Sequence, residues 1–363
     1  MSTDTDDDDE RTYYVDGARR PARETPSSPA ALVGAREKCV YTVSLARRSS
    51  ERPSTLTLDD ASDHIERLRQ FTNLASAFPF VPSEETVREV RERVVEDVER
   101  ALAARAAARP NEEKVVVTAL VRRGEKESNI VTEVLIEPAP AREEPGEALV
   151  GAYVALDAAT TTTARKPTMF KYGDWVRERA PFEERLRAWN EAHPDETCVE
   201  CVMALKRPDP NDPSREETVL TEGLKSNFAV YATKDRCVHC VDARLALPGI
   251  TLNTLKKYIM YYAASVDQFR GPILSDVERG AFDACILASA LRGVHPVDFL
   301  ILDSGRPDVP RARVNFPASR TFARDMNELI HDPRAAPGRA EPFRDDDATT
   351  KSRPEPENVR FIL

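Results

Sequence analysis

The chain has 363 residues, of which 41% are hydrophobic, so it is long enough for a sizeable core and for two lobes, because single cores stop growing at about 250–300 residues. Its net charge of -10 disfavours nucleic acids and anionic membranes as partners, since either needs a basic field. No run approaches the roughly 18 apolar residues of a membrane span, and the acidic start is unlike a secretory or transit signal, so we expect a cytoplasmic location and a small-molecule ligand.

Both ends of the chain lack apolar periodicity. Residues 1–36 combine an aspartate run with Pro, Ser and Arg, and residues 334–363 are rich in charges and helix breakers, so neither is expected to bury enough surface to offset the entropy of ordering. We therefore expect disordered tails at 1–36 and 334–363, a small N-terminal lobe at 37–156 and a larger C-terminal lobe at 157–333.

The first lobe is expected to mix helices and strands. Ser83 followed by two glutamates is an N-cap signal, and an apolar stripe of valines continues from it to the stop at Pro110, which predicts a helix. A second helix is predicted over 61–74. Strands are predicted at 39–46, 114–120, 131–136 and 149–156, which makes this lobe α+β.

The second lobe shows the same mixture. Helices are predicted at 175–193, from 247 to 264, and at 321–330. Strands are predicted at 198–205, 217–220, 228–232, 237–241, 284–287 and 297–302. Three prolines between positions 208 and 213 predict a long hairpin loop inserted outside the sheet.

The motifs narrow the chemistry. No GxGxxG, GxxxxGK[ST] or HExxH pattern occurs, which disfavours dinucleotide, P-loop and zinc-protease sites. Five other motifs follow one another along the chain: DHIERL at 63–68, KYGDWVR at 171–177, TEGLKSNF at 221–228, LPGIT at 247–251 and SALRGVHPV at 289–297. Over about residues 38–302 this order resembles the class IV aminotransferases, the fold-type IV pyridoxal phosphate (PLP) enzymes that include branched-chain and D-amino-acid aminotransferases and aminodeoxychorismate lyase.

The resemblance implies a two-lobed α+β fold of the D-amino-acid aminotransferase type, with a mixed sheet or pseudo-barrel in the larger lobe. It also implies a PLP-dependent transaminase that acts on an amino acid and a 2-oxo acid through a Schiff base on Lys171. A homodimer is implied as well, because the active site of the family is completed by a partner subunit.

Roles for single residues follow from the same resemblance. Arg67, which follows His64 in the HxxRL pattern, is similar to the arginine that binds the cofactor phosphate, and Glu222 to the carboxylate paired with the pyridine nitrogen. The remaining phosphate contacts would come from Gly249, Ile250, Thr251 and Ser289.

The chemistry of these residue types is compatible with those roles. A lysine must be neutral to form an imine, and a carboxylate against the ring nitrogen keeps the ring an electron acceptor. Gly249 at a helix start offers free N–H groups to an anion. Taken alone, Arg67 and Lys171 would be read as solvated surface charges and LPGIT as an ordinary helix start. Lys166, in a polar linker before a proline, is the rival candidate for the imine.

The sequence departs from the family pattern at several points. Ser289 is followed by Ala290, which removes one side-chain phosphate donor, and Val176 replaces a tyrosine of branched-chain enzymes. The strand at 115–121 carries neither family's pattern for binding the substrate carboxylate. Possible carboxylate clamps are Arg122, Arg123, Arg177 and Arg292, because a guanidinium suits a bidentate carboxylate.

Two cysteine pairs, Cys198-x2-Cys201 and Cys237-x2-Cys240, have the spacing of a four-thiolate zinc site. The first pair lies in a predicted strand, where positions i and i+3 point to opposite faces, so we expect no metal and reduced thiols.

Two alternatives to a transaminase remain open. A lyase of the aminodeoxychorismate type would use the same Lys171 and Glu222 but eliminate pyruvate. The second alternative is a protein of this fold that has lost catalysis and serves as a binding or scaffold subunit. Ala290 and the missing carboxylate pattern motivate it.

Overall fold

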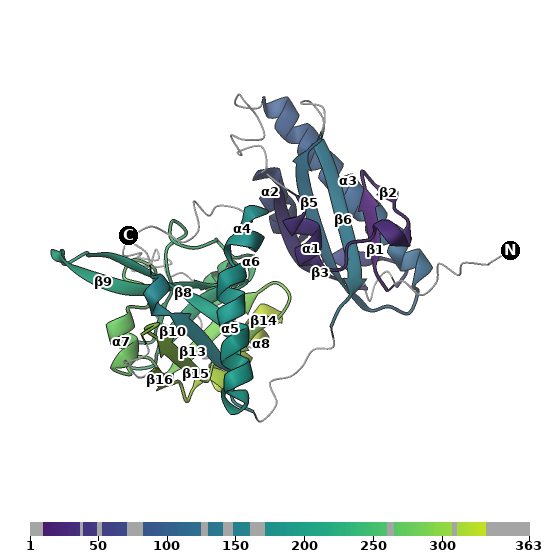
Figure 1. The fold of residues 1–363 in the computed structure, drawn as a ribbon. Coiled ribbons are helices and arrows are strands. Elements are labelled where there is room, and N and C mark those ends of the chain that lie inside the picture. The colour runs from purple at the N-terminus through teal and green to yellow at the C-terminus, as the bar shows by residue number, and fades with distance from the viewer. Residues whose placement is uncertain are drawn as a thin grey trace, which may run out of the picture. The chain divides into compact units, whose positions relative to one another are not determined.

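The computed structural model describes residues 10–36, 39–48, 53–70, 83–124, 130–140, 148–159, 171–259, 265–306 and 311–331. They form two compact units: the first comprises Met1–Glu143 with Thr168–Pro181, and the second Glu144–Pro167 with Phe182–Leu363. Each unit is built around its own sheet with helices against it (Figure 1). The predicted two-lobed α+β organisation is therefore confirmed.

The first unit contains a six-stranded antiparallel sheet in the order β2-β1-β6-β5-β3-β4. Its strands are β1 (Thr12–Val15), β2 (Ala18–Arg19), β3 (Val40–Arg48), β4 (Leu56–Leu58), β5 (Lys114–Arg123) and β6 (Ile130–Pro138). Its helices are α1 (Pro29–Gly34), α2 (Ala61–Arg69), α3 (Glu84–Ala108) and α4 (Asp174–Glu178), with a short 3₁₀ turn at Ala22–Glu24.

Helix α3 follows the expectation from its sequence. Ser83 caps it by accepting a hydrogen bond from Thr86 N at 3.2 Å, and the two acidic residues of its first turn suit the positive end of the helix dipole. Its buried stripe, which includes Val90, Val94 and Val98, packs with α2 against alternating residues of the sheet to make the core of this unit.

The expectation of a disordered tail over 1–36 is wrong for residues 10–36. Strand β1 pairs with β6, and α1 begins at Pro29 behind the N-cap Ser28. Tyr13 and Tyr14 are 4% and 3% exposed, so this short segment buries aromatic area through a partner more than a hundred residues away. The average composition of residues 1–36 concealed the local strand signal TYYV and the Asp16-Gly17 turn. Residues 1–9 and the predicted tail at 334–363 lie outside the described ranges.

The second unit contains a mixed sheet of ten strands. They are β7 (Gly151–Ala155), β8 (Cys198–Asp209), β9 (Asp212–Gly223), β10 (Asn227–Ala232), β11 (Cys237–His239), β12 (Ser265–Asp267), β13 (Ala284–Ser289), β14 (Gly293–Pro296), β15 (Phe299–Asp303) and β16 (Ala312–Asn315). Its helices are α5 (Ala180–Ala192), α6 (Ile250–Ile259), α7 (Leu274–Glu278) and α8 (Ser319–His331), with 3₁₀ turns at Leu156–Ala158 and Pro194–Glu196.

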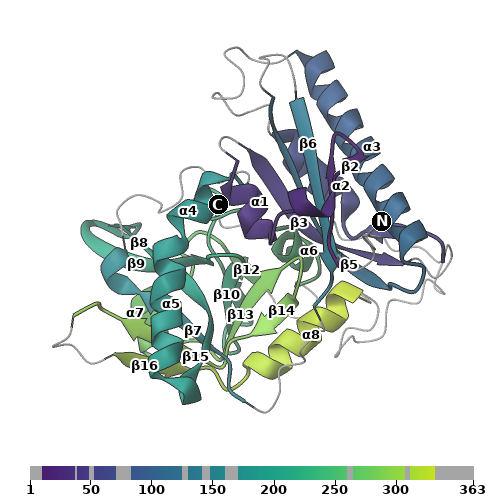
Figure 2. The ribbon, with the colours of Figure 1, turned by 45° about the vertical axis from the view of Figure 1, so that its right-hand side comes forward.

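The sheet of the second unit branches at β10, which pairs with β9, β11 and β13. Its parallel pairs are β7–β8, β7–β15 and β11–β12, and the other pairs are antiparallel, so the predicted mixed sheet is confirmed. Figure 2 shows α8 running along β13 and β14, where Phe322, Met326 and Leu329 are buried. Among the described residues, no helix is both long and apolar enough to cross a membrane.

Two further expectations need correction. Strand β7 was assigned to the first lobe, but it pairs in parallel with β8 and β15 and so belongs to the second unit, while residues 171–181 belong to the first. The proline-rich segment is part of a hairpin rather than a long loop, because β8 extends to Asp209 and β9 begins at Asp212. Among the described residues, the part of β8 after Lys206 and the part of β9 before Thr218 pair only with each other, so a proline there can face outward without removing a ladder hydrogen bond.

Candidate functional site

Lys171 is held by backbone hydrogen bonds to β3 in the first unit. Tyr41 N donates to Lys171 O at 2.9 Å, Gly173 N donates to Cys39 O at 2.9 Å, and Val40 forms an isolated bridge with Tyr172. The Nζ atom of Lys171 lies 5.9 Å from the centroid of the Tyr41 ring. The backbone of Lys171 is therefore fixed by hydrogen bonds to Cys39 and to strand β3.

Helix α2 buries His64 and Arg67 on the same side, three residues apart. His64 Nδ1 lies 2.5 Å from Thr42 Oγ1 on β3. Burial, and then the positive charges of Arg67 and Lys171, lower the pKa of His64 to about 3, so the imidazole is neutral. Arg67 and Lys171 are therefore both close enough to His64 for their charges to lower its pKa.

The other ring nitrogen of His64, Nε2, is buried and has no hydrogen-bond partner among the described residues. A buried polar atom without a partner costs about 1–3 kcal/mol, so such an atom marks a place where a ligand or water is needed. Its position beside two cations favours a ligand with anionic oxygens.

Glu222 lies near the end of β9 in the second unit and is 2% exposed. Its Oε2 accepts a hydrogen bond from Leu247 N at 3.0 Å. The turn that follows is held by a second buried carboxylate, Glu200, which accepts from Ser226 N at 3.1 Å and from Ser226 Oγ at 2.8 Å. Glu222 is therefore rigidly placed, one face of its carboxylate being fixed by the chain that precedes Gly249.

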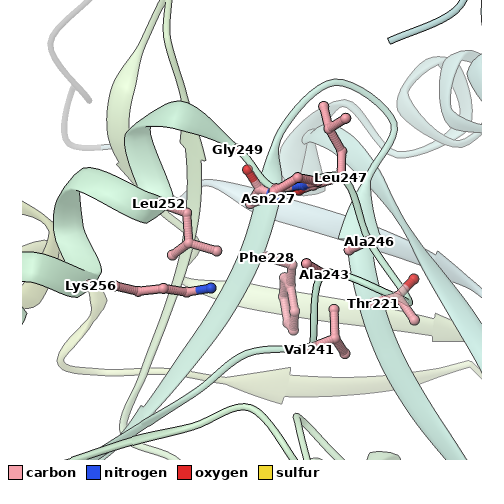
Figure 3. Close-up of a pocket in the computed structure, with 11 residues that line it drawn as sticks. Thr221, Asn227, Phe228, Val241, Ala243, Ala246, Leu247, Gly249, Leu252 and Lys256 are labelled. Carbon is pink, nitrogen blue, oxygen red and sulfur yellow. Dashed lines mark hydrogen bonds between the residues drawn. The ribbon is translucent and has the colours of Figure 1, made fainter. Parts of the chain in front are cut away.

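Gly249 immediately precedes α6, and its place in the turn requires glycine. Asn227 Nδ2 donates to Leu247 O at 2.7 Å, and a Cβ at position 249 would lie 1.5 Å from Asn227 Oδ1 (Figure 3). The first helical hydrogen bond runs from Asn253 N to Gly249 O at 2.9 Å, which leaves the N–H groups of the first turn without intrahelical acceptors. With no acidic side chain in that turn, the helix start suits an anion.

A pocket lies beside this turn in the second unit. Figure 3 shows Lys256 extending from α6 along it, with Phe228 and Val241 opposite. The pocket is lined by Thr221, Asn227, Phe228, Val241, Ala243, Ala246, Leu247, Pro248, Gly249, Leu252 and Lys256. Lys256 Nζ donates to Gln268 Oε1 at 2.9 Å, so the amine is held at the edge of a mainly apolar surface.

The predicted site residues therefore form two local groups. In the first unit Arg67 and Lys171 both act on His64, and in the second Glu222 is tied through Leu247 to the turn of Gly249, Ile250 and Thr251. Ser289 is the last residue of β13, and its Oγ accepts from Arg292 N at 3.3 Å. Lys166 lies outside the described residues.

Sequence reasoning assigned no role to Asn227, Leu247, Thr42 or Glu200, which position the predicted residues. Asn227 stands in the TEGLKSNF motif, so its presence there was a usable signal. Leu247 likewise opens the LPGIT motif, whereas Thr42 and Glu200 are found only through contacts between residues distant in sequence.

Two of the four arginines suggested as carboxylate clamps form salt bridges with carboxylates of the protein itself. Arg122 pairs with the fully buried Glu133, which also pairs with Arg36, and Arg177 pairs with Asp174 on its own helix. These pairs explain why a sequence-level search by residue type alone gives no secure assignment of the substrate carboxylate.

All six cysteines are buried and free. Cys198 and Cys201 lie on β8 and Cys237 on β11, and no group of three or more His, Cys, Asp or Glu side chains in the described ranges is placed to hold a metal ion.

Comparison with known proteins gives no similarity at the level of sequence families: no family model matches the chain and no curated protein matches it. Solved structures do match. The branched-chain amino acid aminotransferase of Thermobaculum terrenum in its PLP form has 13% identity and a TM-score of 0.56, over 89% of this chain and 93% of that one.

Two more solved structures match over most of their length. A fold IV transaminase from Curtobacterium pusillum has 14% identity and a TM-score of 0.59, over 88% of this chain and 98% of that one. A hypothetical aminotransferase from Mycobacterium tuberculosis, in its apo form, has 16% identity and a TM-score of 0.57 over the same shares. The chain therefore has the fold of the fold IV transaminases and branched-chain amino acid aminotransferases.

Proposed function

We propose that this protein is a PLP-dependent aminotransferase that transfers an amino group between an amino acid and a 2-oxo acid. The fold supports the proposal, since solved structures with this fold include transaminases, one of them in a PLP form. The observation that carries it is the buried, neutral imidazole of His64, which lacks a partner at Nε2 among the described residues and whose pKa is lowered by the charges of the buried Arg67 and of the half-buried Lys171.

Two features of the chain fit a phosphorylated cofactor. The cations near His64 favour anionic oxygens, and the turn at Gly249 presents free N–H groups at a helix start. In the proposal, Arg67 and the backbone of Ile250 and Thr251 bind the phosphate, and Ser289 adds a hydroxyl contact.

PLP, when bound, supplies an electron sink for the carbanion formed at Cα of the amino acid. Glu222 would support this by accepting a hydrogen bond from the protonated ring nitrogen, while Leu247 N donates to its Oε2 and holds the carboxylate in place. Lys171 would hold the cofactor through Nζ, and its neutral amine would serve as the base that moves a proton at Cα of the amino acid. The hydrogen bond from Tyr41 N to Lys171 O fixes the point from which this side chain reaches.

An absorbance titration of the purified full chain with PLP tests the proposal directly. We expect a new band at the violet edge of the visible, and borohydride reduction followed by peptide mapping is expected to place the cofactor on Lys171. Lys171→Ala should lose both signals, while the matched control Lys166→Ala should keep them. A wild-type chain that binds no PLP would refute the proposal, as would attachment at Lys166.

The reaction itself is tested by a second set of assays. A coupled 2-oxo acid assay against a panel of L- and D-amino acids should show amino transfer, and a 4-aminobenzoate release assay detects the lyase alternative. PLP binding without either activity would support the scaffold reading. Sedimentation of the PLP-loaded chain tests the accompanying proposal of a homodimer.

A further inference from the structure

Four side chains that the proposed function does not use share one face of the sheet in the second unit. Strands β11 and β12 pair in parallel, with Cys237 opposite Ser265 and His239 opposite Asp267. Because side chains alternate along a strand, residues two apart lie on the same side. The pairing therefore places a thiol, an imidazole, a hydroxyl and a carboxylate side by side.

Asp267 is fixed in a position that orients His239. Its Oδ1 accepts hydrogen bonds from Phe269 N at 2.9 Å and from Arg270 N at 3.0 Å. Its Oδ2 lies 3.4 Å from His239 Nδ1, and the ring of Phe282 packs against the imidazole edge with 5.1 Å between centroids. A carboxylate that is itself held by backbone amides fixes the proton on Nδ1 and the direction of the ring.

The charges in this cluster favour a thiolate beside an imidazolium. Burial disfavours a charged His239, but hydrogen bonds and charge from Asp267 and Cys237 outweigh it and raise its pKa to about 9. Burial likewise opposes ionisation of Cys237, yet hydrogen bonds from His239 and Ser265 lower its pKa below the ordinary thiol value.

The other five cysteines provide an internal contrast. Cys237 is 7% exposed, whereas the others are between 0% and 2% exposed. Burial raises the pKa of every one of them, to about 12 for Cys39, Cys198 and Cys201, to about 11 for Cys240 and well above the usual value for Cys285. Reactivity of thiols follows thiolate content and access, and Cys237 differs from the other five in the direction of its pKa shift, while its exposure is only slightly greater than theirs.

We propose that Cys237, activated by His239 and Asp267, is a nucleophilic thiol that undergoes exchange with low-molecular-weight disulfides, which makes it a site of reversible S-thiolation. The thiolate Sγ attacks one sulfur of the disulfide, a new S–S bond forms to Cys237, and the original S–S bond breaks. The departing sulfur takes the electron pair of that bond and the proton of His239, and leaves as a free thiol.

Incubation of the folded, full-length protein with oxidised glutathione, followed by intact mass and peptide mapping, tests the proposal. We expect one glutathione per chain, located at Cys237 and removed by dithiothreitol. Between about pH 6 and 8 the rate is expected to rise less steeply with pH than that of a free thiol, whose rate rises nearly tenfold per pH unit in this range.

Variants separate activation from mere exposure. His239→Gln should slow the exchange at neutral pH by about tenfold, and Asp267→Asn by less, while the buried-thiol control Cys240→Ser should leave the rate unchanged. The pH profile of the wild-type protein tests the proposal even if one of these variants fails to fold. Modification at another cysteine, modification only after denaturation, or a rate that follows an ordinary thiol pKa would each overturn the proposal.

Discussion

Replacing Gly249 by alanine is expected to destabilise the second unit, because the position of the new methyl group is already occupied. A Cβ there would lie 1.5 Å from Oδ1 and 2.6 Å from Cγ of Asn227. Asn227 cannot turn aside freely, since its Nδ2 donates to Leu247 O at 2.7 Å. Accommodation therefore requires either the loss of that hydrogen bond or a shift of the start of α6.

The expected magnitude follows from these two costs. Overpacking a filled site costs about 1–3 kcal/mol, and losing a buried hydrogen bond adds about 1 kcal/mol. We therefore expect Gly249→Ala to lower the free energy of unfolding by about 2–4 kcal/mol. Urea denaturation of the apoprotein, followed by circular dichroism, measures this change without reference to catalysis.

A double-mutant cycle tests the stated cause. Asn227→Ala removes the oxygen that the methyl group would meet, so Gly249→Ala in that background should cost less than about 1 kcal/mol. The steric reasoning fails if Gly249→Ala costs the same in both backgrounds. It also fails if the single substitution stays within about 0.5 kcal/mol of the wild type.

Two other predictions concern buried polar groups. Folding lowers the pKa of His64 from 6.5 to about 3, so the folded state favours the neutral imidazole. The folded state therefore has its full stability above about pH 6.5 and loses stability as the pH falls from 6.5 towards 3. In urea titrations, the free energy of unfolding should fall by up to about 1.4 kcal/mol for each pH unit between about pH 6 and 4, and this dependence should be absent in His64→Asn. Equal slopes in both proteins would contradict the prediction. Ser319 is fully buried, donates to Val297 O at 2.6 Å and accepts from Cys285 N at 2.9 Å. Ser319→Ala should therefore lower the free energy of unfolding by about 1–3 kcal/mol, and a loss below about 0.5 kcal/mol would be inconsistent with these contacts.

The elements that sequence predicted best are those with local signals. Helix α3 has its cap at Ser83, its acidic first turn and its apolar stripe within one contiguous segment, and the structure has it at Glu84–Ala108. Strand β1 was missed although it carries a local signal, since Thr12–Val15 is rich in strand formers and is followed by the hairpin pair Asp16-Gly17. The composition of residues 1–36 taken as a whole concealed this signal.

The candidate site shows the same division between local and distant information. The motifs pointed to Arg67 and Lys171, and the structure places both near His64. The hydrogen bond from Leu247 to Glu222 joins segments 25 residues apart, and the contacts of Lys171 with β3 span about 130 residues. Such pairings depend on the folded sheet, so sequence spacing alone does not reveal which residues position the proposed chemistry.

The assignment of residues 171–181 to the first unit has a consequence for any attempt to divide the protein. The chain passes from the first unit to the second, returns for this segment, and leaves again near Pro181. A fragment that stops at Glu143 would lack Lys171 and Gly173, the backbone hydrogen-bond partners of Tyr41 and Cys39. A single proteolytic cut in one connection would therefore not separate the two units cleanly. After a cut near Glu143, Lys171 would be covalently part of the C-terminal fragment, but its backbone would still be hydrogen-bonded to Tyr41 of the N-terminal fragment.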